Sequence, residues 1–282
     1  MVMMPLLVTL NSCFGEKMID IEKEKKNGKT KLVKTISLYS FDNFDTRYSG
    51  DELLEYFYDD SQRLTRERFW DGDAQNTFTY TYDNNRITHE VTQEGNKTKM
   101  EYTLDNNSYV TRMNNYDGLT YRGWHTILEY SNGYLSKASY NRSDNNPPSS
   151  VNTYIWEKGN LVKINYANGH SASFTYGNVE NKLNVNFPWI YVGGLPYFRF
   201  FYSRNNMPYM INFYCSLKFK GVMTSKNLPI RTICLEYGET LTQNYSYTFD
   251  SDGYPIEIII KLSEDGKYGY EEETMKYIIT YY

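Results

Sequence analysis

Histidine is the residue type most often used for acid–base chemistry and metal binding, and this chain has three: His89, His125 and His170. None of them lies in the HExxH spacing or in another paired spacing typical of metal sites, so no metal or cofactor is expected. The segment 169–173 (GHSAS) shares its first glycine and its serine with a nucleophile elbow, but it lacks the final glycine. We therefore predict no catalytic histidine or serine.

The acidic residues give no clearer site. Asp71-Gly72-Asp73 and Asp250-Ser251-Asp252-Gly253 are similar to calcium loops, but no glutamate follows either of them at the required distance. A pair of carboxylates for glycoside hydrolysis is available among the 34 acids, yet no spacing distinguishes one pair. We expect no enzyme, and a hydrolase with an unrecognised carboxylate pair stays an alternative.

Aromatic side chains are the remaining candidates for a site. They make up 17% of the chain and include 30 tyrosines, so the rings must supply much of the buried area. Sugar rings stack on exposed aromatic faces, and Trp70, Trp124, Trp189 and Tyr191 are the predicted binding residues for a glycan. The alternative for all four is packing in the core.

The first thirteen residues predict export. MVMMPLLVTLNSC is a short apolar stretch before a charged one, and Leu10-Asn11-Ser12-Cys13 resembles a bacterial lipobox. We predict a lipoprotein signal peptide over 1–13, a lipid anchor on Cys13, a solvated tether over 14–30 and a single β-domain over 31–282. The alternative is a disordered N-terminus with an incidental cysteine. The predicted location is the cell envelope, with the membrane as partner through the anchor.

The net charge of −4 and the pI near 5.6 lack the basic excess of nucleic-acid-binding proteins. There is also no apolar run of 18 residues, so no ordinary membrane-spanning helix is expected.

A recurrent element predicts the fold. Aromatic residues at alternate positions lead into a polar turn of Asp, Asn, Ser and Gly, and an aliphatic residue follows, usually with a basic residue two positions later. This is the pattern of a β-hairpin. The basic positions are interpreted as solvent-exposed charges, with His89 in place of a lysine or arginine. The repeat occurs at 56–66, 80–89, 102–112, 128–137, 154–163 and 247–257. It predicts an all-β antiparallel meander of hairpins that forms a curved sheet or a barrel-like roll.

Three segments depart from the repeat or leave alternatives open. Residues 141–150, with two prolines, predict an exposed loop. Residues 207–220 carry apolar residues at helical spacing after Asn206 and Pro208, and they predict one short helix, with a strand as the alternative. Cys215 and Cys234 are compatible with a disulfide or with two buried thiols.

The hairpins resemble the YD repeats of the large Rhs and teneurin proteins. The chain is also similar to a family of Bacteroidetes envelope lipoproteins known only as a domain of unknown function, on the segments SKNLPIRTICLEYGE (225–239) and YSYTFDSDGYPIEI (245–258) together with the earlier hairpins. This resemblance implies a curved antiparallel sheet over residues 31–282, and it implies no activity or catalytic residue.

The leading hypothesis is a non-catalytic envelope lipoprotein that binds a glycan or protein partner or acts as a scaffold. The alternative outside the enzymes is an outer-membrane β-barrel, because the segment 275–282 ends in an aromatic residue, as such barrels often do. Charged residues at alternating strand positions, such as Glu101 and Lys163, count against a lipid-facing wall.

Overall fold

The described part of the chain is built of β-strands. The structure is a computed structural model, and it describes residues 30–41, 52–71, 74–93, 96–117, 120–144, 146–183, 225–236, 239–266 and 269–282. Contacts group Lys31–Tyr282 into one compact unit. Its strands are β1 (Val33–Phe41), β2 (Glu52–Tyr58), β3 (Leu64–Asp71), β4 (Ala74–Asp83), β5 (Arg86–Gln93), β6 (Asn96–Leu104), β7 (Val110–Asp117), β8 (Thr120–Ser131), β9 (Tyr134–Asn141), β10 (Ser150–Glu157), β11 (Asn160–Asn165), β12 (Ser171–Glu180), β13 (Asn227–Glu236), β14 (Glu239–Phe249), β15 (Pro255–Gly266) and β16 (Gly269–Tyr281).

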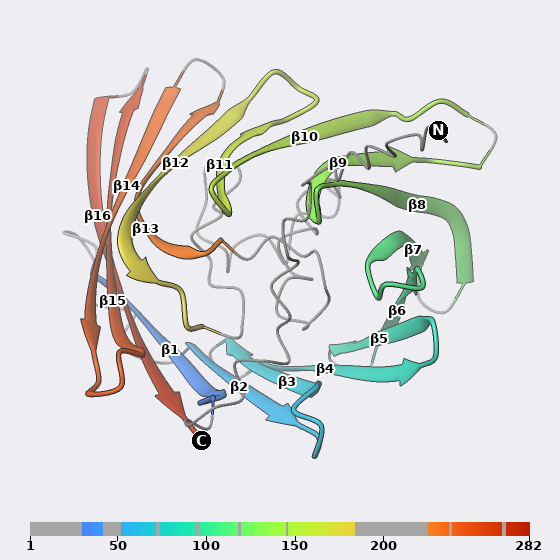
Figure 1. The fold of residues 1–282 in the computed structure, drawn as a ribbon, viewed down its shortest axis with the longest axis horizontal. Coiled ribbons are helices and arrows are strands. Elements are labelled where there is room, and N and C mark those ends of the chain that lie inside the picture. The colour runs from blue at the N-terminus through green and yellow to red at the C-terminus, as the bar shows by residue number, and fades with distance from the viewer. Residues whose placement is uncertain are drawn as a thin grey trace, which may run out of the picture. The chain divides into compact units, whose positions relative to one another are not determined.

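The sixteen strands form one closed antiparallel barrel in chain order, and β16 pairs with β1 to complete the ring (Figure 1). This confirms the predicted all-β meander of hairpins and gives its closed form. Residues 142–149 join β9 to β10, as the sequence predicted for a loop. Within the described ranges, no helix is long and apolar enough to cross a membrane.

Several predictions concern residues outside the described ranges. These are the signal peptide over 1–13 with Cys13, the tether over 14–29, the helix over 207–220, and Cys215. Cys234 lies buried on β13, and the predicted pairing with Cys215 stays a prediction.

All six repeat segments are hairpins, and acidic side chains fix several of the turns. The Asp105 carboxylate accepts hydrogen bonds from the backbone N–H groups of Asn107 and Tyr109, at 2.8 and 2.9 Å. Asp250 does the same for Asp252 and Tyr254, both at 2.9 Å. Such side-chain bonds replace backbone partners in a reversing chain. We call the end of the barrel that carries the turns 59–63, 84–85, 105–109, 132–133, 158–159 and 250–254 the turn end.

A second set of hydrogen bonds ties the strands together at the turn end. An aromatic residue near the end of an even-numbered strand donates a hydrogen bond to a carbonyl at or near the start of the odd-numbered strand before it. In β6 the position is occupied by Leu104, which has no donor. The bridges are Tyr58 to Val33 (3.0 Å), Tyr82 to Leu64 (2.7 Å), Tyr130 to Val110 (2.8 Å), Trp156 to Leu135 (2.8 Å), Tyr176 to Leu161 (2.7 Å), Tyr247 to Pro229 (2.6 Å) and Tyr281 to Pro255 (2.6 Å).

The residue after a turn packs on the bridging ring of the next repeat. The Arg63 guanidinium lies 4.7 Å from the Tyr82 ring centroid. The Tyr134 and Trp156 ring centroids are 4.8 Å apart. Tyr109 on Tyr130 and Tyr254 on Tyr281 repeat this arrangement at 4.9 and 5.3 Å. Four hairpins are thus coupled to the following strand pair through one ring.

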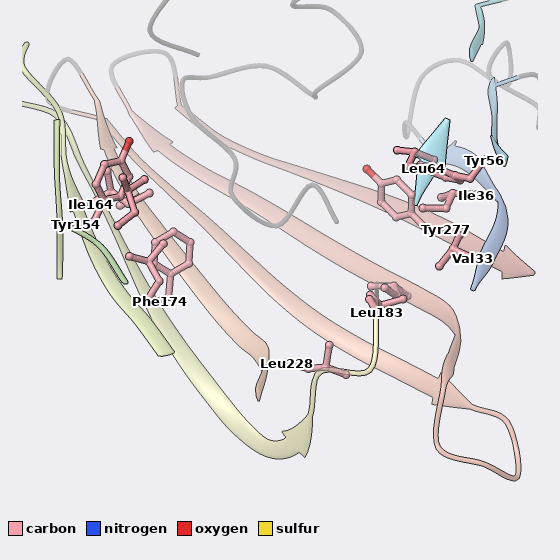
Figure 2. Packing of buried hydrophobic residues seen from close by; sticks show 14 of the residues in the cluster. Val33, Ile36, Tyr56, Leu64, Tyr154, Ile164, Phe174, Leu183, Leu228 and Tyr277 are labelled. Carbon is pink, nitrogen blue, oxygen red and sulfur yellow. The ribbon is translucent and has the colours of Figure 1, made fainter. Parts of the chain in front are cut away.

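The two faces of the wall differ sharply in burial. Ile258, Ile260 and Tyr277 are 0%, 1% and 2% exposed, whereas Lys261 and Thr280 on the alternate face are exposed. Successive side chains of a strand point to opposite faces. Phe174 and Tyr277 lie on the inner side of their strands (Figure 2), so the apolar face lines the interior and the polar face is the outside. Figure 2 shows core side chains from both halves of the chain on the inner side of their strands.

A β-bulge determines where the basic residue of each repeat points. The aliphatic and basic residues are two positions apart, so a regular strand would place them on one face. Five of the six hairpins contain a register shift between these positions, as where Phe57 and Tyr58 pair with Arg66 and Leu64. The extra residue turns the basic side chain to the outside. In three hairpins it is Thr65, Thr111 or Ser136, whose hydroxyl donates to a carbonyl of the paired strand.

The hairpin of β4 and β5 has no bulge, and this corrects the interpretation of His89. Tyr82 pairs with Ile87 and Tyr80 with His89 in regular register. The imidazole therefore lies on the same inner face as Ile87 and is 0% exposed. The prediction that His89 replaces an exposed lysine or arginine was wrong, because the sequence pattern does not reveal the missing bulge.

We predict that the bridging hydroxyls contribute measurably to stability. Tyr82→Phe removes the donor to the Leu64 carbonyl and should lower the free energy of unfolding by about 1 kcal/mol in chemical denaturation. Tyr134→Phe is the matched control, because the Tyr134 side chain is 38% exposed and stacks on a neighbour without being one of the bridges. Equal losses in the two variants would contradict a special role for the bridge.

Candidate functional site

Two of the four predicted glycan-binding aromatics lie in the described ranges. Trp124 lies on β8 and is 37% exposed. Trp70 lies on β3, where its backbone pairs with Leu53 and Gln75. Trp189 and Tyr191 fall outside the described residues. The glycan hypothesis therefore stays a prediction that depends on Trp124 in this part of the chain.

The outer wall around Arg112 instead carries a dense polar cluster. The Arg112 guanidinium donates to Asp144 (2.7 Å), Tyr121 (3.0 Å) and Asn114 (2.8 Å). His125 completes the cluster, with Nε2 3.5 Å from the Asp144 carboxylate. Arg112, Asn114 and His125 come from the paired strands β7 and β8, while Asp144 comes from the loop 142–149. The loop is thereby held against the outside of the wall.

Gly123 lies next to the loop in a backbone conformation that favours glycine. It has a φ of +85°, and a Cβ there would lie 3.5 Å from the Arg142 carbonyl oxygen. Its own carbonyl oxygen lies 3.0 Å from His125 Nδ1, which fixes the orientation of the ring. Trp124 is between these two residues, and adjacent residues of a strand point to opposite faces, so its indole is directed away from the cluster.

A second polar group lies next to the first on the same wall. Tyr116 donates a 2.6 Å hydrogen bond to Glu101, and Lys99 forms a 2.7 Å ion pair with the same carboxylate. The rings of Tyr116 and Tyr121 are 5.5 Å apart, so they connect this group to the Arg112 cluster. Burial, together with the bond to Glu101, raises the pKa of Tyr116 to about 12.

The electrostatics of the cluster do not suit acid–base catalysis. The hydrogen bond from Arg112 holds the pKa of Asp144 below its usual value. The pKa of Glu101 is also lowered, because the bonds from Lys99 and Tyr116 outweigh the opposing effect of desolvation. A glycosidase needs one carboxyl group that stays protonated near neutral pH. Both carboxylates here are ionised, so the cluster is suited to holding the loop or to polar recognition.

The interior contains a different kind of site, an aromatic cage around His89. The Tyr80 ring is parallel to the imidazole, with an interplanar angle of 6° and centroids 4.7 Å apart. Phe78 and Tyr102 lie at 5.8 and 6.4 Å, and the Tyr102 hydroxyl is 3.4 Å from Nδ1. Complete burial lowers the pKa of His89 to about 3. The imidazole is therefore neutral at physiological pH and acts as an aromatic core residue.

The remaining motifs of the sequence have structural roles. Segment 169–173 runs from the β11–β12 turn into β12, so the strand-to-helix geometry of a nucleophile elbow is absent there. The Asp250 and Asp252 carboxylates each lie 2.6 Å from the ammonium of Lys31, which takes the place that a cation would occupy in a calcium loop. Across the described ranges, no three His, Cys, Asp or Glu side chains are grouped to hold a metal ion.

Comparisons with known proteins identify the fold and no family. No family model and no curated protein match the chain. Among solved structures it is similar to a porin-like protein from Bacteroides uniformis ATCC 8492, with a TM-score of 0.63 and 18% sequence identity. The match covers 90% of this chain and 98% of that one. The similarity supports the closed barrel.

We predict that acid destabilises the protein through His89. The pKa of His89 is about 6.5 in the unfolded chain and about 3 in the folded chain, so between these pH values only the unfolded chain binds the proton. The free energy of unfolding should therefore fall with pH, by up to about 1.4 kcal/mol per pH unit from this group. His89→Phe keeps a ring in the cage and should show a shallower slope between pH 6 and pH 4. Parallel slopes for the two proteins would contradict this assignment.

We also predict that Asp144 holds the loop 142–149. Asp144→Asn keeps the shape of the side chain but removes the ion pair with Arg112. Hydrogen exchange should become faster in this loop, with little change in global stability, as is usual for exposed ion pairs. Glu129→Gln breaks the exposed Lys137–Glu129 pair and is the control, in which exchange of the loop should be unchanged. Unchanged exchange in Asp144→Asn would show that backbone contacts alone hold the loop.

Proposed function

We propose that this protein is a non-catalytic β-barrel of the cell envelope, with its described wall in water and a lipid at Cys13 as its attachment to the membrane. The closed barrel and the similarity to a porin-like protein support the outer-membrane β-barrel alternative better than the lipoprotein binding module that was the leading hypothesis. A location at the outer membrane or elsewhere in the envelope agrees with both findings.

The polarity of the two faces carries this proposal. A barrel wall in a bilayer needs an apolar outer band about 25 Å tall, and a charge at its middle costs about 2–4 kcal/mol. Here the outer face holds ion pairs within the strands, as between Glu257 and Lys276 on β15 and β16. Glu129 and Lys137 form another such pair on β8 and β9. The wall is therefore suited to water on its outside.

The interior is equally unlike that of a polar channel. Porins line their lumen with polar side chains and leave it filled with water. In this barrel most inner-face residues are aliphatic or aromatic, and Tyr102, Ala172 and Ile258 are each 0% exposed. A few polar residues are buried among them, including Glu67, Thr232 and Gln243. We infer a barrel that does not conduct polar solutes and that meets its partners on the outside, where the Arg112 cluster is the candidate surface for a glycan or protein partner.

A second candidate function is a membrane-spanning outer-membrane barrel. The observation that favours it is the similarity to a solved protein described as porin-like. It requires the outer-face ion pairs to lie outside the hydrocarbon region, or the wall to rearrange in lipid.

Membrane fractionation separates the two candidates. We expect the full chain in the membrane pellet. In a signal-exchanged variant, residues 1–13 are replaced by a cleavable export signal that has no lipidated cysteine. We expect this variant in the soluble fraction without detergent. It should keep the β-sheet circular dichroism signal of the parent protein. A folded, signal-exchanged chain that stays in membranes through carbonate washing would contradict the proposal and support the spanning barrel.

A further inference from the structure

We infer that the turn end of the barrel faces a lipid bilayer, so that the membrane surface is the partner of this end. The inference deepens the proposed function and rests on lipid attachment at Cys13. The observation that supports it is the position at which the chain enters the barrel.

The chain enters the barrel at the turn end, where Lys31 is held by several contacts. The Lys31 ammonium bonds to Asp250 and Asp252 on the β14–β15 turn, both at 2.6 Å, and lies 5.4 Å from the Tyr254 ring centroid. The Lys31 backbone N–H donates to the Tyr254 hydroxyl at 3.2 Å. One residue later, the Leu32 carbonyl accepts a 3.0 Å hydrogen bond from the Tyr282 N–H. Everything before Lys31 therefore joins the barrel at this end.

The length of the preceding chain sets the average distance expected between Cys13 and the point of entry. Seventeen residues, 14–30, separate Cys13 from Lys31, and a random-coil chain of this length would span about 21–25 Å on average. The longest strand, β16, has 13 residues, which at typical rise and tilt is roughly 30–35 Å of wall height. The opposite end thus lies beyond the average reach of the tether, while the turn end lies within it.

Exposed side chains at the turn end suit the level of lipid headgroups. The Tyr134 hydroxyl and the Lys226 side chain both lie against Gly159, at 3.4 Å from the position of a Cβ there. Tyr134, Lys158 and Lys226 are exposed, and so is Glu157. Tyrosine and lysine place an apolar body and a polar tip at a membrane–water interface. The charges are mixed, so the anchor and not electrostatic attraction determines the orientation.

Energy transfer from labelled positions to the membrane surface tests the orientation. Asn106→Cys marks the turn end, in the β6–β7 turn, and Ala167→Cys marks the opposite end, in the β11–β12 turn; both positions are exposed. Each is made in the full, acylated chain with Cys215→Ser and Cys234→Ala, and placed on phosphatidylethanolamine–phosphatidylglycerol vesicles that carry headgroup acceptors. With roughly 30 Å between the ends, transfer from Asn106→Cys should exceed that from Ala167→Cys about twofold or more.

The outcomes separate this inference from the proposed function. Equal transfer, or stronger transfer from Ala167→Cys, in a protein that needs its lipid for vesicle attachment would overturn the orientation alone. A different result would overturn both the orientation and the proposed function. In that result the protein attaches to vesicles without its lipid, and a water-soluble quencher shows that the two labels lie on opposite sides of the bilayer. A circular dichroism spectrum of each labelled protein that matches the spectrum of the parent protein excludes unfolding as the cause of a change in energy transfer.

Discussion

The hydrogen bond from a ring donor to a strand-start carbonyl is the interaction on which this barrel depends. In the β4–β5 hairpin, the turn joins the even strand to the following odd strand, and the ring donor joins it to the preceding one. Tyr82 ends β4 next to the turn into β5 and bonds back to Leu64 at the start of β3. Because the post-turn residue of one repeat also packs on the ring of the next, as Arg63 does on Tyr82, the end of the barrel is a chain of neighbour contacts. This is the physical use of the many tyrosines.

Much of the fold follows from the sequence because its determinants are local. Alternating aromatics and Asp–Asn–Gly turns specify hairpins, and all six predicted segments are hairpins. Two properties are not local. The bulges that turn Arg66 outward and their absence at His89 depend on strand pairing. The cluster of Arg112 with Asp144 joins residues 32 positions apart through a loop, and no spacing in the sequence indicates it. The predicted aromatic site stays a prediction, because Trp189 and Tyr191 lie outside the described ranges.

Closure of a sheet and the solvent that it faces are separate properties of a barrel. The order of the strands and their registers determine that β16 meets β1, whereas the alternation of side chains determines which face is apolar. A closed barrel can therefore have a polar outer face and an apolar inner face. In this chain the inner face holds Ile258 and Tyr277 and the outer face holds the Glu257–Lys276 pair. That distinction, more than the outline of the fold, determines the function that we propose.

The hydrogen bonds between adjacent repeats have a consequence for how such proteins diversify. Seven of the eight even strands bridge to the preceding strand through the same kind of ring donor, and the Tyr282 contacts with Leu32 and Tyr56 lie near the seam where the last strand meets the first. A gene duplication or deletion of one whole repeat would leave each remaining junction chemically intact and would widen or narrow the circumference by two strands. Related barrels with different numbers of strands can thus arise while the contacts that close the barrel stay the same.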